Sequence, residues 1–270
     1  MRLYSIAVYL FLYIPIGIIV LFSFNAGRHA SELRGFSVQW YGKALSNPFV
    51  GDAFFASLVI ALSAAVLSSI MGTTAALALQ RLKGPAKVFF DGLIYVSIMI
   101  PGIVIGISTL IALVTVFDFL NPVLASLWPA GTKPPKLSMG YGTVIAAHTL
   151  FTMSLVIVVV RARIAGMDRS LVDASNDLYA TPWRTFYQIT LPQIFPAILA
   201  GFLLSFTFSF DDFIVSFFVA GANTTLPIYV FSSIRRGITP EVNAIGTMVL
   251  AVSLILLIIA QYLLRGKTDR

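Results

Sequence analysis

The stretch FFASLVIALSAAVLSSIMGTTAALALQ, Phe54–Gln80, contains no charged side chain and decides the fold class. A helix needs about 20 mostly apolar residues to cross ~30 Å of hydrocarbon at ~1.5 Å per residue. The strands of a membrane barrel are shorter, about 10 residues, and alternate between apolar and polar side chains. The stretch therefore predicts a membrane-spanning helix.

Further apolar runs of similar length lie on both sides of it: Ser5–Phe24, Val88–Phe117, Tyr141–Val160, Gln193–Val219 and Asn243–Leu264. Together they predict an all-α integral membrane protein with six transmembrane helices. The first run is longer than the ~7–15 apolar residues of a signal peptide, so we expect an uncleaved first helix. Pro101-Gly102 in the middle of the third run predicts a kink, which either lines a cavity or serves packing alone.

The composition excludes several classes of protein. Of 270 residues, 58% are hydrophobic and 11% are charged, whereas a soluble domain has about 25% charged residues. Soluble globular proteins and disordered chains are therefore excluded. The chain has no cysteine, which rules out disulfides, thiolate metal sites and cysteine nucleophiles. Its two histidines, His29 and His148, are too few to predict a metal site, and we expect His148 to be a hydrogen-bonded packing residue.

The net charge of +7 has two readings, an interaction with nucleic acid or the positive-inside bias of membrane proteins. The basic residues gather in short loops between apolar runs, which favours the membrane bias. With the N-terminus inside, 11 of the 18 basic residues fall in cytoplasmic segments and 7 in outer segments. This distribution predicts that both termini are cytoplasmic.

Residues 161–192, between the fourth and fifth runs, form a long connection with a pattern of its own. Asp168 and Asp173 suit the start of a helix, and Thr181-Pro182 then interrupts the pattern. Aromatic and aliphatic residues follow at helical spacing: Trp183, Phe186, Tyr187 and Ile189. The segment predicts two short cytoplasmic helices whose apolar face docks a soluble partner.

Within this connection, Asp173-Ala174-Ser175, Tyr179 and Ile189-Thr190-Leu191-Pro192 resemble the signature loop of binding-protein-dependent ABC importer permeases. That motif reads Glu-Ala-Ala, three residues, Gly, nine residues, Ile-x-Leu-Pro. Asp173, Ser175 and Tyr179 depart from it. Where the family has glycine, Tyr179 must either bend the chain differently or place its ring at the partner contact.

The resemblance implies a type I ABC importer permease fold, with 1–270 as one transmembrane permease domain and 161–192 as its coupling loop. The residues it implies for coupling to the ATPase are Asp173, Ala174, Ser175, Leu178, Tyr179, Ala180, Thr181 and Pro182. The segments Leu204–Ser216 and Thr239–Ala244 look like the second, six-helix permease of spermidine/putrescine importers.

A chain of that kind is implied to be a multi-pass protein of the bacterial plasma (inner) membrane that forms half of a translocation pathway for polyamines. The implied partners are a second permease subunit, two ATPase subunits and an extracytoplasmic solute-binding protein. The sequence contains no Gly-x-x-x-x-Gly-Lys-Ser/Thr phosphate loop, so we expect a non-catalytic subunit. We expect no cofactor in this chain, with ATP and Mg used by the ATPase subunits.

Asp211 and Asp212 are the acidic residues that fall well inside a predicted span. A carboxylate at mid-bilayer costs at least ~2.5–3.5 kcal/mol, so it usually faces a cavity or a partner. Neighbouring positions on a helix point ~100° apart, so one aspartate can line the pathway while the other pairs with a neighbouring group. The alternative for both is an interhelical salt bridge or a cap where the helix breaks near Ser209.

Two more residues are candidates for the substrate pathway. Phe208 offers an aromatic face for cation–π contact with a polycation, or packs in the core or against lipid. Glu241 follows Pro240 at the start of the sixth run and either lines the pathway or complements the helix dipole.

Two connecting segments carry predictions of their own. The proline-rich segment Asn121–Met139 predicts a stiff extended loop, and Leu226–Ile234 predicts a short interfacial or re-entrant helix at the outer mouth. Arg235 and Arg236, which follow that helix, either contact a binding protein or are solvated.

Other functions remain open on the sequence alone. An ABC importer of this kind could carry another cation, an amino-acid derivative or a sugar. A secondary transporter would usually show duplicated halves and charged relay residues across several spans, and we see neither. An intramembrane enzyme would need a nucleophile with a base or a set of metal ligands within the spans.

Overall fold

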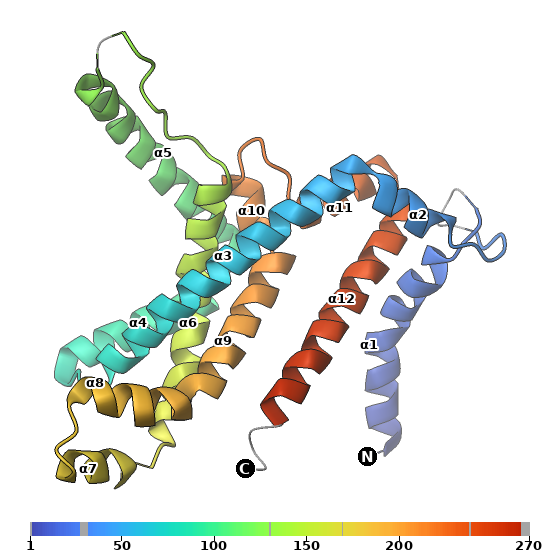
Figure 1. The fold of residues 1–270 in the computed structure, drawn as a ribbon. Helices are drawn as coiled ribbons and strands as arrows, with labels where there is room; N and C mark the ends of the chain where they lie inside the picture. The colour runs from blue at the N-terminus through green and yellow to red at the C-terminus, as the bar shows by residue number, and fades with distance from the viewer. Residues whose placement is uncertain (1, 28–31, 130, 169, 238, 266–270) are drawn as a thin grey trace. The chain divides into compact units, whose positions relative to one another are not determined.

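The structure is a computed structural model that describes residues 2–27, 32–129, 131–168, 170–237 and 239–265 (Figure 1). Its regular secondary structure in this part is helical, apart from one isolated bridge between Asn25 and Phe36. The chain divides into two compact units, Met1–Ala56 with Thr224–Arg270, and Ser57–Asn223.

The first unit is built from the two ends of the chain. It contains α1 (Arg2–Ser23), α2 (Gln39–Ser46), the first turns of α3 (Pro48–Leu79), α11 (Leu226–Arg236) and α12 (Pro240–Arg265). Helices α1 and α12 pack side by side, and α2 packs against α12. The predicted short helix at Leu226–Ile234 is confirmed as α11, with Arg235 and Arg236 exposed at its end.

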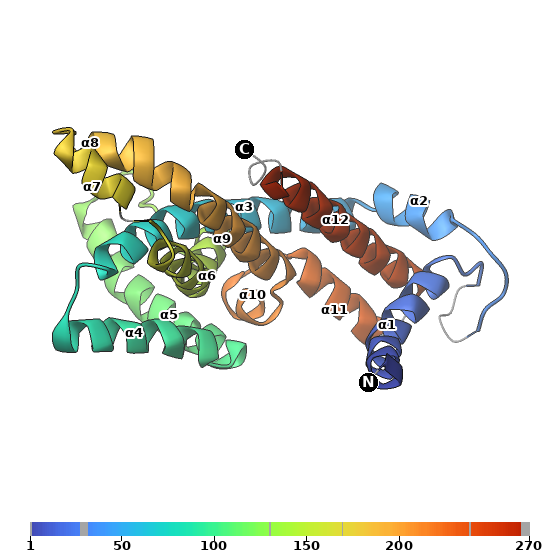
Figure 2. The same ribbon diagram turned by 90° about the horizontal axis from the view of Figure 1, so that it is seen from below.

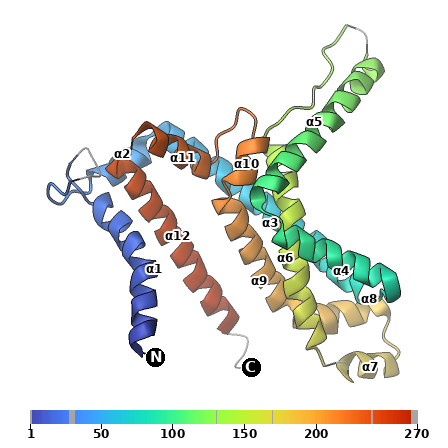
Figure 3. The ribbon, with the colours of Figure 1, turned by 180° about the vertical axis from the view of Figure 1, so that it is seen from behind.

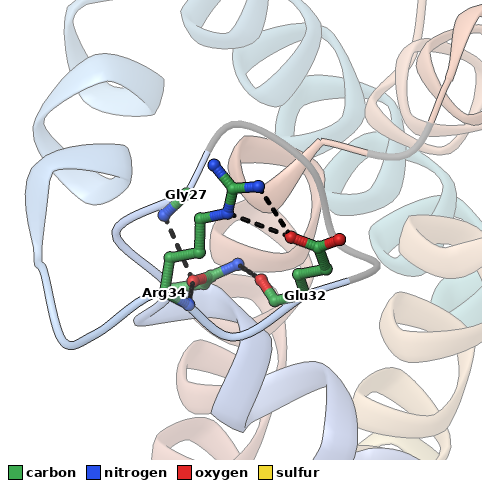
Figure 4. Close-up of polar contacts among 4 residues, drawn as sticks. Gly27, Glu32 and Arg34 are labelled. Carbon is green, nitrogen blue, oxygen red and sulfur yellow. Dashed lines mark hydrogen bonds and ion pairs between the residues drawn. The ribbon is translucent and has the colours of Figure 1, made fainter.

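The connection between α1 and α2 is organised around the buried side chain of Asn25 (Figure 4). Its Oδ1 accepts hydrogen bonds from the backbone N–H groups of Gly27 (3.1 Å) and Arg34 (2.9 Å), and its Nδ2 donates to the Glu32 carbonyl at 2.7 Å. The indole of Trp40 donates to the Asn25 carbonyl at 2.7 Å. Hydrogen bonds to one buried amide therefore join the described parts of this connection, whereas the exposed Arg34–Glu32 ion pair adds little.

The second unit contains the remainder of α3 and all elements up to α10. These are α4 (Gly84–Met99), α5 (Gly102–Leu127), α6 (Tyr141–Ala165), α7 (Ser170–Asp177), α8 (Pro182–Thr185), the π-helical turn η1 (Phe186–Thr190), α9 (Leu191–Asp211) and α10 (Ile214–Val219). Helix α6 packs against α9, α4 and α10, and α10 also lies against α5 (Figure 3).

Small residues on the neighbours of α6 let the backbones approach closely. Every fourth residue of α6 from Val144 to Val160 is buried. A Cβ added to Gly72 of α3 would lie 2.8 Å from the Val156 Cβ, and one added to Gly201 of α9 would lie 3.2 Å from Val156 Cγ1. Close approach of this kind is typical of helix packing in membranes, where interfaces are rich in small residues.

The prediction of several membrane-spanning helices is confirmed by length and composition. Five helical stretches in the described residues are long and apolar enough to span a bilayer: Tyr4–Ser23, Pro48–Leu79, Gly102–Leu127, Tyr141–Ala165 and Pro182–Asp211. Helix α12 contributes a further apolar helical stretch, Pro240–Ile255, which is shorter than these five. The count of six spans, the cytoplasmic termini and the single permease domain over 1–270 stay predictions.

The predicted third span is wrong in one respect, because Val88–Phe117 is two helices and not one kinked helix. Helix α4 ends at Met99, and the extended backbone of Ile100 (φ −65°, ψ 131°) and Pro101 (φ −56°, ψ 136°) separates it from α5. Proline lacks an N–H group and disfavours the helical conformation of the residue before it, so the helix ends at this point.

Two other boundaries also differ from the predictions. Helix α5 continues to Leu127, so the first residues of the predicted extended loop Asn121–Met139 are helical. The predicted fifth span, Gln193–Val219, is interrupted at Asp212 and Phe213, between α9 and α10. The second interruption lies beside the two aspartates and is the starting point for the candidate site.

Candidate functional site

The interruption between α9 and α10 occurs without proline or glycine. Asp211 ends α9, Asp212 takes an extended conformation (φ −70°, ψ 120°), and Phe213 returns to helical angles before α10 begins at Ile214. No residue of the sequence Asp211-Asp212-Phe213-Ile214 forbids a continuous helix by its covalent structure. Side-chain contacts must therefore favour the break.

Asp212 supplies one of those contacts by capping α10. Its Oδ2 accepts a hydrogen bond from the backbone N–H of Ser216 at 2.9 Å, and its side chain is 15% exposed. The same oxygen lies 3.3 Å from Nε2 of His148 on α6. A carboxylate at the start of a helix satisfies backbone N–H groups that have no partner in the preceding turn. The cap that the sequence left open as an alternative for Asp212 is therefore present.

His148 connects the two sides of the break, and its side chain is fully buried. Its Nδ1 lies 2.7 Å from Ser209 Oγ on α9, and its Nε2 lies 3.1 Å from Ser216 Oγ on α10. The prediction that His148 is a hydrogen-bonded packing residue is confirmed. Its partners are 61 and 68 residues away in sequence, and no local pattern pointed to them.

A serine, a histidine and an aspartate in mutual contact raise the possibility of a nucleophilic site. Ser209 and His148 are both buried, however, and a nucleophile has to reach a substrate. No cluster of three or more potential metal ligands exists among the described residues. The arrangement therefore has the character of a structural network.

Asp211 differs from Asp212 in its exposure and in its contacts. Its side chain is exposed on the single chain, and it makes no hydrogen bond or ion pair within the part of the chain that the structure describes. Phe208, one turn earlier on α9, is also exposed. Residues three apart lie on one helix face, so a carboxylate and an aromatic ring are presented side by side.

Glu241 lies in the other unit, in the first turn of α12. Its Oε1 accepts a hydrogen bond from Asn47 Nδ2 at 3.1 Å, and the same amide group donates to the Tyr229 hydroxyl at 3.1 Å. Asn47 follows α2, and Tyr229 belongs to α11. Glu241 therefore joins three elements of its unit, and no local sequence pattern predicted the contacts of Asn47 with Glu241 and Tyr229.

The Pro101 break borders a cavity of about 700 Å³ between α3, α4, α5 and α6. Ile100 and Val104, on either side of the break, are among its lining residues, and most of the others are aliphatic or aromatic. Burial of a charge in such surroundings carries a large desolvation cost. The cavity is therefore unsuited to a polycation, although it agrees with the prediction that the Pro101 region can line a cavity.

The connection after α6 contains the two short helices that the sequence predicts. Asp168 accepts hydrogen bonds from Ser170 at the start of α7, with Ser170 N–H at 2.9 Å from Oδ1, and these bonds hold the pKa of Asp168 below its usual value. Thr181 caps α8, and Pro182 is its first residue. Ser175 Oγ and Thr185 Oγ1 lie 2.8 Å apart, both buried, and join α7 to α8. The two short helices lie side by side (Figure 2).

Tyr179 occupies the turn between α7 and α8 with a positive φ of 55°. Its N–H donates to the Asn176 carbonyl at 2.9 Å, and the Ala180 N–H donates to the Ser175 carbonyl at 3.1 Å. These two bonds are the pattern of a Schellman helix end, in which glycine is usual. Tyr179 thus adopts the left-handed turn that the motif's glycine favours, and it does not bend the chain differently. Its ring is 95% exposed.

The surface of this segment is apolar. Leu178, Trp183 and Tyr187 are exposed beside Tyr179, and the rings of Trp183 and Tyr187 stack with centroids 6.0 Å apart. Of the eight residues predicted to couple to an ATPase, Ser175 is buried and Ala180 is half-buried, and the other six are exposed: Asp173, Ala174, Leu178, Tyr179, Thr181 and Pro182. Contiguous exposed apolar side chains often mark a surface that binds another protein.

Several apolar helices of spanning length define the class of multi-pass α-helical membrane proteins. Residues 64–268 match the family described as the binding-protein-dependent transport system inner membrane component. The chain belongs to this family and is a multi-pass protein of the bacterial inner membrane.

Relatives and a solved structure extend this result over nearly the whole chain. The chain is 38% identical over 263 residues to the putrescine transport system permease protein PotI of Escherichia coli K12, covering 96% of this chain and 89% of PotI. It is 34% identical over 263 residues to the spermidine/putrescine transport system permease protein PotC of the same strain, covering 97% and 92%. A bacterial ABC transporter that imports the acidic polysaccharide alginate has a chain with a TM-score of 0.77 at 17% identity, covering 99% of this chain and 94% of that one, which shows the fold.

Proposed function

We propose that this chain is a permease subunit of an ATP-driven ABC importer and forms half of the translocation pathway for polyamines such as putrescine and spermidine. The observation that carries the proposal is the similarity to PotI and PotC over at least 96% of the chain. The proposed architecture has six spans with both termini in the cytoplasm. The length of α12, Pro240–Arg265, and the distribution of basic residues support it.

Asp211 is the proposed contact for the cation. Its carboxylate has no protein partner in the described chain, whereas Asp212 caps α10 and contacts His148. A carboxylate next to the ring of Phe208 offers ion pairing and cation–π contact, and both suit a flexible chain with several ammonium groups. Glu241 is a second proposed pathway residue, because its contact with Asn47 involves one of its two oxygens.

The segment 161–192 is proposed to dock on an ATPase subunit that hydrolyses ATP with Mg²⁺, so that this chain itself is non-catalytic. Helices α8, η1 and α9 form one uninterrupted helical stretch, Pro182–Asp211, of 30 residues. At ~1.5 Å per residue this stretch is ~45 Å long. It runs from the proposed ATPase contact to Asp211, so a rigid displacement at one end moves the other.

The proposed partners are a second permease subunit, two ATPase subunits and an extracytoplasmic solute-binding protein. The family description, which names a binding-protein-dependent system, supports the last of these. The exposed apolar surface on α7 and α8 supports a soluble partner on that side.

The test is uptake of labelled putrescine and spermidine by cells that lack their own polyamine importers and express this chain with its co-purifying partner subunits. We expect accumulation that requires ATP and stops when this chain is omitted. Competition with unlabelled arginine, a sugar and a second polyamine identifies the solute class. Uptake that polyamines do not inhibit, or uptake by the isolated chain driven by an ion gradient, would contradict the proposal.

A further inference from the structure

A side chain that belongs to neither helix contacts both sides of the break between α9 and α10. His148 comes from α6 and contacts Ser209 of α9 through Nδ1 and Ser216 of α10 through Nε2. The Asp212 carboxylate, at the break itself, is within 3.3 Å of Nε2. One imidazole ring therefore touches the end of one helix, the start of the next and the residue between them.

Further hydrogen bonds hold the backbone of His148 in place. The Thr152 hydroxyl donates to the His148 carbonyl at 2.7 Å, and Ser68 Oγ of α3 lies 2.6 Å from the Thr152 hydroxyl. All of these groups are buried. A buried network in which each member has a partner is rigid, and loss of one member leaves each of its partners short of one hydrogen bond.

The break lies directly after Asp211. Asp211 is the last residue of α9, directly before the extended residue Asp212. If α9 continued through Asp212 and Phe213 as a regular helix, the Asp212 carboxylate would lose the Ser216 N–H that it caps. The direction of the following α10 would change as well.

From this geometry we propose that His148 is a positioning residue, which holds the α9–α10 break directly after Asp211, the proposed contact for the translocated cation. The inference rests on the proposed function for the role of Asp211, but the structural part stands alone. His148 acts through Ser209, Asp212 and Ser216 and does not itself contact the cation.

Three substitutions of His148 test its contact with Ser209 separately from its contacts with Asp212 and Ser216. His148→Asn keeps a polar atom near the Nδ1 position, toward Ser209, and His148→Gln keeps one near the Nε2 position, toward Asp212 and Ser216. His148→Leu removes both. The matched control is Thr149→Val, since Thr149 is buried on the same helix but its hydroxyl bonds only within its own helix, to the Ile145 carbonyl at 2.7 Å.

The structural readout is the distance between spin labels at Phe195→Cys on α9 and Phe217→Cys on α10, both exposed positions. The chain has no cysteine, so these labels are unique in it. The measurement is made in the assembled transporter in lipid, with cysteine-free partner subunits. We expect one narrow distance distribution in the wild type and in Thr149→Val, and a broadened or shifted one in His148→Leu. His148→Asn and His148→Gln should lie between these limits.

The functional readout is polyamine uptake and ATP hydrolysis by the same samples. We expect His148→Leu to lower the maximal uptake rate about 5- to 100-fold, the range that corresponds to unsatisfied buried polar groups. ATP hydrolysis should persist, so that the ratio of polyamine transported to ATP hydrolysed falls. Partial recovery of that ratio in His148→Gln or His148→Asn is expected, because a residue that only fills space would not be rescued by a smaller polar side chain.

Label distances in His148→Leu that match the wild type would overturn the proposal, whatever the uptake rate. If His148→Leu does not assemble, distances in both His148→Asn and His148→Gln that match the wild type would overturn it equally. Failure of the proposed function has a different signature, normal polyamine uptake in Asp211→Asn, and it leaves the distance measurement valid.

Discussion

The two interrupted helices of the Ser57–Asn223 unit are broken by different means. Between α4 and α5, Pro101 breaks the helix through its own covalent structure. Between α9 and α10 the chain contains no such residue, and the break coincides with contacts from His148 and Asp212. The first break is therefore set by covalent structure, whereas the second coincides with side-chain contacts that single substitutions can remove.

The two breaks also meet in space. Helix α5, which starts at the first break, packs against α10, which starts at the second. A Cβ on Gly106 of α5 would lie 2.7 Å from Cδ2 of Phe218 and 3.4 Å from the Val215 Cα. The absence of a side chain at Gly106 therefore allows α5 and α10 to pack closely beside the two breaks.

The largest effect is expected from Pro101→Ala, which removes the covalent cause of the first break. Proline in a helix interior costs ~3 kcal/mol, so its removal favours one continuous α4–α5 helix by up to about that amount. The amide of Gly102 should then exchange with deuterium more slowly than in the wild type, because it gains a carbonyl partner in the preceding turn. Pro122→Ala is the control, since Pro122 lies inside α5 without breaking it. Exchange at the Gly102 amide as fast as in the wild type would show that tertiary packing, and not proline, maintains this break.

Gly106→Val should destabilise the packing of α5 on α10 by about 1–3 kcal/mol, the usual cost of overpacking. The expected result is a lower melting temperature of the purified transporter and slower uptake. Gly102→Ala is the matched control, because the nearest atoms to its new Cβ would be those of Ile214 at 3.8 Å. Equal melting temperatures for the two variants would mean that the close packing of α5 on α10 at Gly106 does not contribute to stability.

Asp212→Ala should remove the cap of α10 at a cost of ~1 kcal/mol. Asp212→Asn keeps an acceptor for the Ser216 N–H and should lose much less. The measurement is hydrogen exchange at the Ser216 amide. It should be faster in the alanine variant but not in the asparagine variant. If both variants exchange alike, the carboxylate does not cap the helix and the second break has another cause.

The smallest effect concerns a third irregular backbone position, the left-handed turn at Tyr179. A non-glycine residue in this conformation is strained by ~1–2 kcal/mol, and glycine loses ~0.5–1 kcal/mol more backbone entropy on folding. Tyr179→Gly should therefore stabilise the end of α7 by about 0.5–1 kcal/mol, seen as slower exchange at the Ala180 amide. ATPase stimulation should weaken in the same variant, because the exposed ring is lost. Unchanged ATPase stimulation would show that the ring is not part of the docking surface.

Features with a local cause were predictable from the sequence. The spacing of carboxylates and Thr181-Pro182 gave the two short helices, and a proline in an apolar run gave the interruption at residue 101, although as a kink and not as a break. The left-handed turn at Tyr179 follows a motif in which glycine is usual. In each case the residue that determines the structure lies within a few positions of it.

Features with a distant cause were not predictable. Asp212 could equally line a pathway or cap a helix until Ser209, Ser216 and His148 were placed beside each other. The Asn47–Glu241 contact joins residues 194 positions apart. Helix α5 passes through Pro122 to Leu127, where the sequence favoured a loop.

The central claim is that Asp211 meets the cation while Asp212 maintains the backbone, and the paired variants Asp211→Asn and Asp212→Asn test it most directly. Polyamine uptake and ATP hydrolysis are measured on the assembled transporter in lipid vesicles. The account predicts that Asp211→Asn loses most polyamine uptake with ATP hydrolysis intact, and that Asp212→Asn retains most of both. Normal uptake in Asp211→Asn together with loss of uptake in Asp212→Asn would contradict it.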